Sequence, residues 1–224
     1  MMELEPKKLN FDISDIEIIS DEKVAAYERQ QEIYRIQEKY ERYKKSGVPA
    51  KFFNESLETF IAKTDEEKKN LQTVREFTEN PKNKILLLCG NNGNGKSHLL
   101  SGIIRECGGE YITSSQLCVE YEAATSYHSE RTREQILRHY STEVSMLVID
   151  ECGKYTLNEK LEQFLLAYIF STRYENDLAT GAATNADKKE FIEFLGKSFF
   201  DRCTEVCTTL DFTGPSKRQA RREI

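Results

Sequence analysis

The sequence predicts an α/β protein with a five-stranded parallel sheet, preceded by an N-terminal helical segment. Two observations support this fold class. Short apolar runs alternate with amphipathic stretches through most of the chain, as in sheets whose strands are connected by helices. In addition, one apolar run is followed by a glycine-rich loop and then by a helical pattern, which is typical of a phosphate-binding loop.

The first element is a long helix, predicted over residues 21–45 because this stretch has no glycine or proline and is rich in Glu, Gln, Lys, Arg and Tyr. Its apolar positions are sparse and mostly aromatic. Such a stripe suits packing on the protein's own body or docking in a partner's groove. The break at Gly47-Val48-Pro49 predicts a division into an N-terminal helical partner-docking segment, residues 1–48, and a main domain, residues 49–224.

The main domain opens with a helix that has a capping box, Thr64 with Glu67, at its start. Short apolar runs and helical patterns then alternate. Runs of this kind, separated by helices, predict a parallel sheet with both faces covered. The five runs are Ile85–Cys89, Tyr111–Thr113, Met146–Ile149, Leu178–Ala183 and Val206–Leu210.

The strongest motif is an eight-residue loop of the form GxxxxGK[ST]. Its glycines allow successive backbone N–H groups to face phosphate oxygens, and the following helix adds its positive N-terminal dipole. Lys96 is expected to reach the β- and γ-phosphates, and the Ser97 hydroxyl to ligate magnesium. The loop therefore predicts ATP and Mg2+ as cofactors. Its residues are Gly90, Asn91, Asn92, Gly93, Asn94, Gly95, Lys96 and Ser97.

A second motif, Asp150-Glu151, follows the apolar run Met146–Ile149. The carboxyl ends of parallel strands are where ligands bind in open α/β sheets. We expect Asp150 to hold magnesium, directly or through water, and Glu151 to act as the general base for the attacking water. The adjacent Glu151 favours hydrolysis over nucleotide binding alone.

Two further residues admit two interpretations each. Asn185 ends a small-residue strand and would position the attacking water if that strand lies beside the phosphate-loop strand, but Asn is also an ordinary turn residue. Arg202 follows Phe199-Phe200-Asp201 and could complete a neighbouring subunit's ATP site. From the residues alone, a surface pair of Asp201 with Arg202 is the simpler interpretation.

The motifs occur in the order found in one family. The stretch from Gly47 to Arg218 resembles the DnaC-type replicative helicase loaders and the related IstB transposition helpers, both AAA+ ATPases. The resemblance implies that Asn185 is a sensor-1 residue and that Arg202 acts in trans in self-association. It also implies nucleotide contacts for His98 and Arg218, the latter as sensor 2. The matching pieces are Gly47-Val48-Pro49, Gly95-Lys96-Ser97-His98-Leu99, Asp150-Glu151-Cys152-Gly153, Arg173-Tyr174, Thr184-Asn185, Asp201-Arg202 and Ser216-Lys217-Arg218.

The resemblance also implies partners. Residues 114–140 occupy the place of a helical insertion that contacts single-stranded DNA, although glutamates are interspersed among the basic and aromatic residues there. The N-terminal segment departs from loaders with a zinc-binding docking domain, because residues 1–48 contain no cysteine or histidine. A helix over residues 21–45 would then dock on the replicative DNA helicase in its place.

Composition limits the partners and the location that the protein can have. The formal net charge is −6, so nucleic-acid contact requires a local basic patch. No run of 18 apolar residues or signal-peptide pattern occurs, and the six cysteines form no CxxC pair, so we expect a cytoplasmic protein without membrane contact. The leading functional hypothesis is an ATP-dependent helicase loader. The alternatives are an IstB-like transposition helper, a P-loop small-molecule kinase and a non-hydrolysing adaptor.

Overall fold

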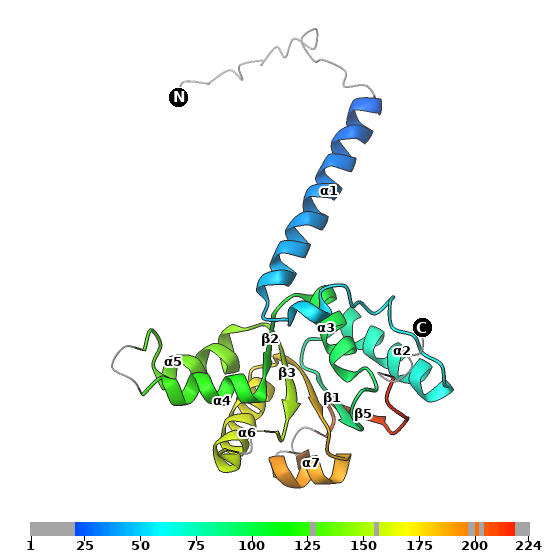
Figure 1. Cartoon of the computed structure of the whole chain (residues 1–224). Coiled ribbons are helices and arrows are strands. Elements are labelled where there is room, and N and C mark those ends of the chain that lie inside the picture. The colour runs from blue at the N-terminus through cyan, green and yellow to red at the C-terminus, as the bar shows by residue number, and fades with distance from the viewer. Residues whose placement is uncertain (1–20, 126–128, 155–156, 197–199, 202–203, 218–224) are drawn as a thin grey trace, which may run out of the picture. The chain divides into compact units, whose positions relative to one another are not determined.

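The computed structural model describes residues 21–125, 129–154, 157–196, 200–201 and 204–217 (Figure 1). The chain divides into two compact units, residues 1–38 and residues 39–224, and each is described by itself. The functional division into residues 1–48 and 49–224 stays a prediction.

Helix α1 (Asp21–Lys45) has the bounds that its composition predicts. The described side chains of the smaller unit, from residue 23 to residue 38, are all exposed. Several large apolar side chains are among them, including Tyr27 at 66% and Tyr34 at 63% exposure. The last turn of α1 belongs to the larger unit, where Tyr43 is buried and its hydroxyl lies 2.5 Å from Ser101 Oγ.

The larger unit contains the predicted five-stranded parallel sheet, whose strand order is β2-β3-β4-β1-β5. Strand β4 therefore lies between β1, which precedes the phosphate loop, and β3, which carries the acidic pair. All neighbouring strands are parallel, so their carboxyl ends meet at one edge of the sheet. The strands are β1 (Ile85–Gly90), β2 (Glu110–Thr113), β3 (Met146–Cys152), β4 (Ala179–Thr184) and β5 (Cys207–Phe212).

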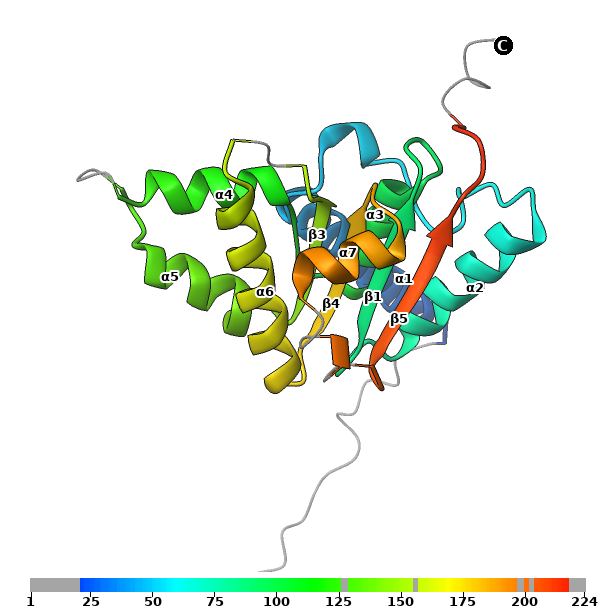
Figure 2. The same cartoon turned by 90° about the horizontal axis from the view of Figure 1, so that it is seen from below.

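Helices cover both faces of the sheet, as the apolar runs predict (Figures 1 and 2). Side chains alternate along β1, so Ile85 and Leu87 enter one core while Leu86 and Leu88 enter the other. The first core is closed by α4 (Ser114–Ala123), α5 (Arg133–Arg138), α6 (Glu159–Glu175) and α7 (Lys188–Leu195). The second is closed by α3 (Lys96–Cys107), α2 (Asp65–Glu79) and residues 43–60, which include the short 3-10 helix η2 (Ala50–Phe52).

Helices α2 and α4 begin with side-chain caps. The predicted box at α2 is confirmed, because Thr64 accepts from the Glu67 backbone N–H and Glu67 accepts from that of Thr64. Thr113 forms the same kind of capping box with Gln116, so α4 begins directly where β2 ends. In the described part of the chain no helix has both the length and the apolar character that a membrane crossing requires.

Arg173, in the last turn of α6, is fully buried at the amino ends of β3 and β4. Burial lowers the pKa of its guanidinium to about 10, so it remains charged at neutral pH. Its acceptors are the carbonyl oxygens of Tyr140, Val144, Ser145 and Ala179 and the Thr180 hydroxyl. Arg173 therefore joins α6 to the π-helical turn η3 (His139–Glu143) and two strands, at the sheet edge opposite the phosphate loop.

Candidate nucleotide and magnesium site

The phosphate loop leaves β1 at its carboxyl end and enters α3 through Gly95. Gly95 has φ 93° and is the N-cap of α3. A Cβ at this position would lie 2.5 Å from Phe60 Cε2, so both the backbone conformation and the contact require glycine. The N-terminus of α3 is thereby directed at the carboxyl edge of the sheet, where an anion is favoured.

Lys96 lies within this loop and is 7% exposed. Its ammonium donates to the Gly90 carbonyl at 2.5 Å, the Asn91 carbonyl at 2.7 Å and Asn185 Oδ1 at 3.3 Å. Asn185 follows β4, and β4 pairs with β1, which is the condition on which its predicted role depends. The sheet thus brings two of the predicted catalytic residues into contact.

The acidic pair lies within a distortion of β3. The pairing of β3 with β4 shifts between Ile149 and Cys152, and Glu151 has a left-handed φ of 60°. Such a conformation is costly for a non-glycine residue, and bulges of this kind are common beside active sites. Asp150 points inward, 4% exposed, while Glu151 is half-buried; Asp150 Oδ1 accepts the Glu151 backbone N–H at 2.8 Å.

The predicted base, Glu151, is paired with Lys154, whose ammonium lies 3.0 Å from Glu151 Oε1. Both side chains are partly exposed, so the ion pair contributes about 0–1 kcal/mol. We therefore expect Lys154→Ala to change the rate of ATP hydrolysis by about fivefold or less. Steady-state phosphate release measures this, and a loss of more than about a hundredfold would instead give Lys154 a role in the chemistry.

The asparagines of the loop hold the C-terminal segment. Asn94 is buried, and its amide donates to the carbonyls of Phe212 at 3.0 Å and Gly214 at 2.7 Å. Asn91 donates similarly to Thr213 at 3.1 Å. The backbone N–H of Lys217 donates to Gly93 at 2.9 Å. Residues 212–217 thus border the phosphate loop, which agrees with the place that the family resemblance implies for Ser216-Lys217-Arg218. The remaining asparagine of the loop, Asn92, is exposed.

His98 lies in the first turn of α3 and faces residues 55–60, where its Nδ1 is 2.8 Å from Glu55 and its Nε2 is 2.7 Å from the Ser56 carbonyl. Its ring also packs edge-on against Phe60. In this arrangement His98 fixes the segment beside the loop, and its predicted nucleotide contact stays a prediction. Arg202 and Arg218 lie outside the described residues.

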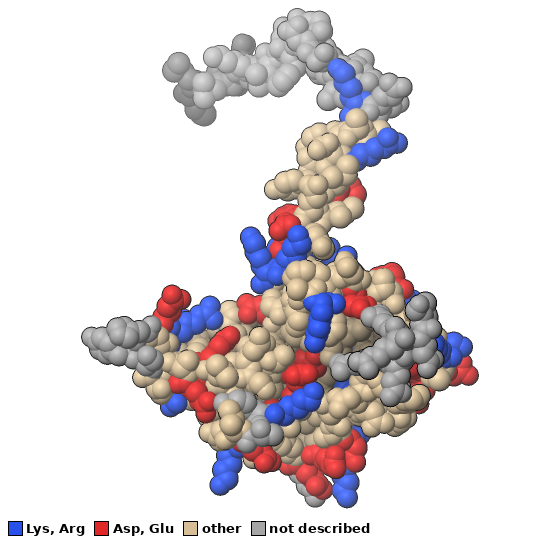
Figure 3. Space-filling view, in the orientation of Figure 1, with Lys and Arg blue, Asp and Glu red and all other residues tan. Residues whose placement is uncertain are grey.

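Residues 114–140, the predicted DNA-contacting region, form α4, α5 and the start of η3, with positions 126–128 outside the described residues. Arg133 stacks on the Tyr121 ring at 4.8 Å and donates to the Tyr121 carbonyl. Arg138 is paired with Glu143 at 2.9 Å. Acidic and basic side chains are interspersed over this face of the larger unit (Figure 3). These arginines therefore have internal partners, and DNA contact stays a prediction.

The donor set fits magnesium–ATP. A buried carboxylate, Asp150, and the hydroxyl of Ser97 both contact the Tyr111 hydroxyl, so two oxygen donors of the type that Mg2+ prefers lie close together. The ammonium of Lys96 and the N-terminus of α3 supply positive charge for a polyphosphate beside them. Asn185 and Glu151 complete the edge with an amide and a second carboxylate.

Comparison with known proteins gives a fold but no sequence family. No family model matches the chain, and no curated protein matches it. A solved structure described as the DnaC helicase loader superposes with a TM-score of 0.61 at 21% identity, covering 74% of this chain and 100% of that one. DnaI gives 0.59 at 21% identity, covering 76% and 94%. The replication initiator DnaA bound to AMPPCP and single-stranded DNA gives 0.55 at 18%, covering 75% and 51%.

The chain therefore shares its fold with these solved structures, and that fold contains the five-stranded parallel sheet that the sequence predicts. The structures to which it is similar include a helicase loader and a replication initiator. At identities of 18–21% this likeness concerns the fold, and activity and partners are considered next.

Proposed function

We propose that the protein is a magnesium-dependent ATPase that loads a replicative DNA helicase. The observation that supports the ATPase is the convergence of Lys96, Asn185, Asp150 and Glu151 on one edge of the sheet. The fold shared with a helicase loader along that loader's whole length supports the biological role.

In this proposal, the Lys96 ammonium exchanges its carbonyl acceptors for β- and γ-phosphate oxygens. Asn185 orients a water molecule for in-line attack, and Glu151 takes its proton as the water oxygen bonds to the γ-phosphorus. The bond from this phosphorus to the bridging oxygen breaks, leaving ADP and phosphate. Magnesium, when bound through Ser97 and Asp150, would neutralise developing charge on the phosphates. Arg202 would complete the site of a neighbouring subunit.

Partner docking is assigned to α1. Between residues 23 and 38 it carries exposed apolar side chains, a composition suited to a partner's groove. These side chains are Val24, Tyr27, Ile33, Tyr34 and Ile36. ATP binding would favour assembly and hydrolysis would release the helicase.

The test is size-exclusion chromatography with light scattering of the full chain mixed with its host's replicative helicase, in ATP, ADP or no nucleotide. We expect a nucleotide-sensitive complex. Tyr27→Ala with Tyr34→Ala should weaken it at least about tenfold, because interfaces depend on a few aromatic anchors. The matched control is Tyr168→Ala, an exposed tyrosine of α6, which should leave the complex intact.

The absence of a complex in every nucleotide state, with ATP hydrolysis intact, would contradict helicase loading. The same mixing experiment with a transposase then tests the IstB-like alternative. A complex that survives the Tyr27 and Tyr34 substitutions would contradict docking through α1 while leaving the loader role in place.

A further inference from the structure

Tyr111, in the edge strand β2, lies at the magnesium site without belonging to any of the sequence motifs. Its side chain is buried, with 3% exposed. Its hydroxyl donates to Asp150 Oδ2 and lies beside the Ser97 side chain. A single hydroxyl therefore lies against both residues predicted to hold magnesium.

The other Asp150 oxygen accepts the Glu151 backbone N–H at 2.8 Å. The Asp150 carboxylate is therefore held at both oxygens.

The backbone of Tyr111 is itself held on both sides. Tyr111 pairs with Val148 of β3, and its N–H donates to the Ser46 carbonyl at 2.7 Å. The adjacent Gly47 has φ 87°, and a Cβ there would lie 2.2 Å from the Tyr111 carbonyl oxygen. The segment after α1 thus fits against the backbone of Tyr111, which limits how far the ring can move.

We propose that Tyr111 is a positioning residue of the magnesium site, whose phenol orients Asp150 and Ser97 to receive the metal of magnesium–ATP. This inference rests on the proposed ATPase function. Hydrogen bonds from such outer partners set the orientation of metal-binding side chains, and their loss costs about 10- to 100-fold in metal affinity. Tyr111 does not touch the reacting atoms in this proposal; it acts through the two ligands.

The test measures binding of a fluorescent, slowly hydrolysed ATP analogue to the full chain while Mg2+ is titrated. We expect Tyr111→Phe, which keeps the buried ring, to raise the half-saturating Mg2+ concentration at least about tenfold. Affinity for the analogue in EDTA should stay unchanged, because Lys96 and the loop are intact. The loss of a structural hydrogen bond alone would not move the Mg2+ requirement.

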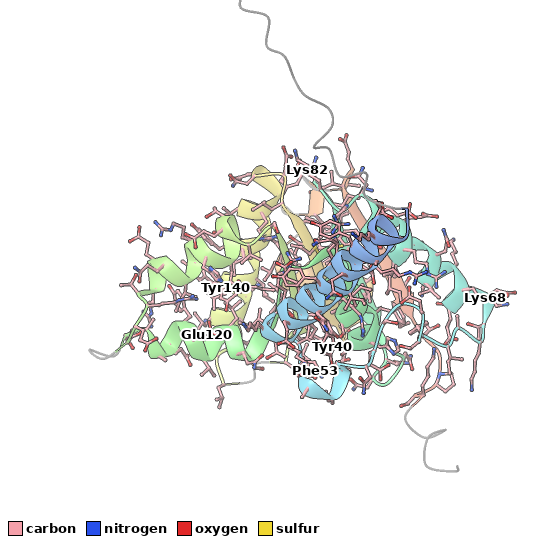
Figure 4. All side chains as sticks on the ribbon, turned by 90° about the horizontal axis from the view of Figure 1, so that it is seen from above. Tyr40, Phe53, Lys68, Lys82, Glu120 and Tyr140 are labelled. Atoms are coloured by element: carbon pink, nitrogen blue, oxygen red, sulfur yellow. The ribbon has the colours of Figure 1, made fainter. Side chains whose placement is uncertain are left out.

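Tyr140→Phe is the matched control. Tyr140 is a buried tyrosine whose hydroxyl donates to Glu120 at 2.9 Å and not to a predicted magnesium ligand; both side chains are labelled in Figure 4. It should lose comparable stability and keep the wild-type Mg2+ requirement. Both variants are compared at a temperature where thermal unfolding shows them to be folded.

An unchanged Mg2+ requirement in Tyr111→Phe, or an equal rise in Tyr140→Phe, would overturn the proposal. A wild-type protein whose analogue affinity does not respond to Mg2+ would instead contradict the magnesium-dependent ATPase. The two failures are therefore distinguishable in one experiment.

Discussion

Glu151→Gln should lower the rate of ATP hydrolysis by at least about a hundredfold while magnesium–ATP binding is retained. A positioned general base contributes about 10²–10⁴ in rate, and the amide cannot accept the proton. Glutamine has nearly the same shape as glutamate, so residue 151 should keep its left-handed backbone conformation, with φ 60°. Phosphate release measures the loss, and binding of a fluorescent nucleotide measures what is retained.

Two control variants test whether the loss of hydrolysis is specific to Glu151. Glu159→Gln removes an exposed carboxylate at the start of α6 and should leave the rate unchanged. Lys96→Ala should abolish binding as well as hydrolysis. A wild-type rate in Glu151→Gln would place the base elsewhere. A wild-type protein that binds magnesium–ATP and releases no phosphate would support the non-hydrolysing adaptor.

Arg173→Met should destabilise the protein by about 3–5 kcal/mol, because each hydrogen bond to a charged group contributes about 1.5–3 kcal/mol; this is a large share of the about 5–15 kcal/mol that holds a domain folded. The substitution removes five hydrogen bonds from a charged donor and leaves three buried carbonyl oxygens, those of Tyr140, Val144 and Ala179, without it. Methionine keeps much of the volume, so the loss is mainly polar. Urea unfolding of the purified variant measures the change in the free energy of unfolding.

Arg138→Met is the control for Arg173, because Arg138 is exposed and makes a surface ion pair with Glu143 at 2.9 Å. It should cost less than about 1 kcal/mol. If Arg173→Met costs no more than Arg138→Met, the buried network does not hold the amino ends of β3 and β4 together.

The main elements of the fold could be read from the chain because their signals are local. The helix over residues 21–45, the capping box at Thr64 and the five apolar runs all appear in the structure within a few residues of their predicted bounds. The run predicted as Met146–Ile149 continues to Cys152 through the bulge at the acidic pair. A bulge leaves no periodic signal, so its position was not predictable.

The order of the strands in the sheet could not be predicted from the sequence, because apolar strands that are buried on both faces have no residue pattern that identifies their neighbours. Strand order decides whether Asn185 meets Lys96. The two residues are 89 positions apart, and the Lys96 ammonium donates to Asn185 Oδ1 at 3.3 Å only because β4 lies beside β1. Arg173 is a similar case. At a helix end it resembles a surface cation, but tertiary packing buries it among carbonyls.

The sequence by itself determined the fold class and the order of the phosphate loop, the acidic pair and Asn185, since each is a local pattern attached to the end of a strand. The tertiary structure alone decided what those residues touch. Tyr111 looks like any aromatic core residue of a strand, and its hydroxyl reaches Asp150 and Ser97 because parallel pairing aligns β2 with β3 beside α3. Asn91 and Asn94 match a phosphate-loop motif, yet their amides bind the segment after β5. Hydrogen bonds between residues far apart in the chain depend on packing that no local pattern encodes.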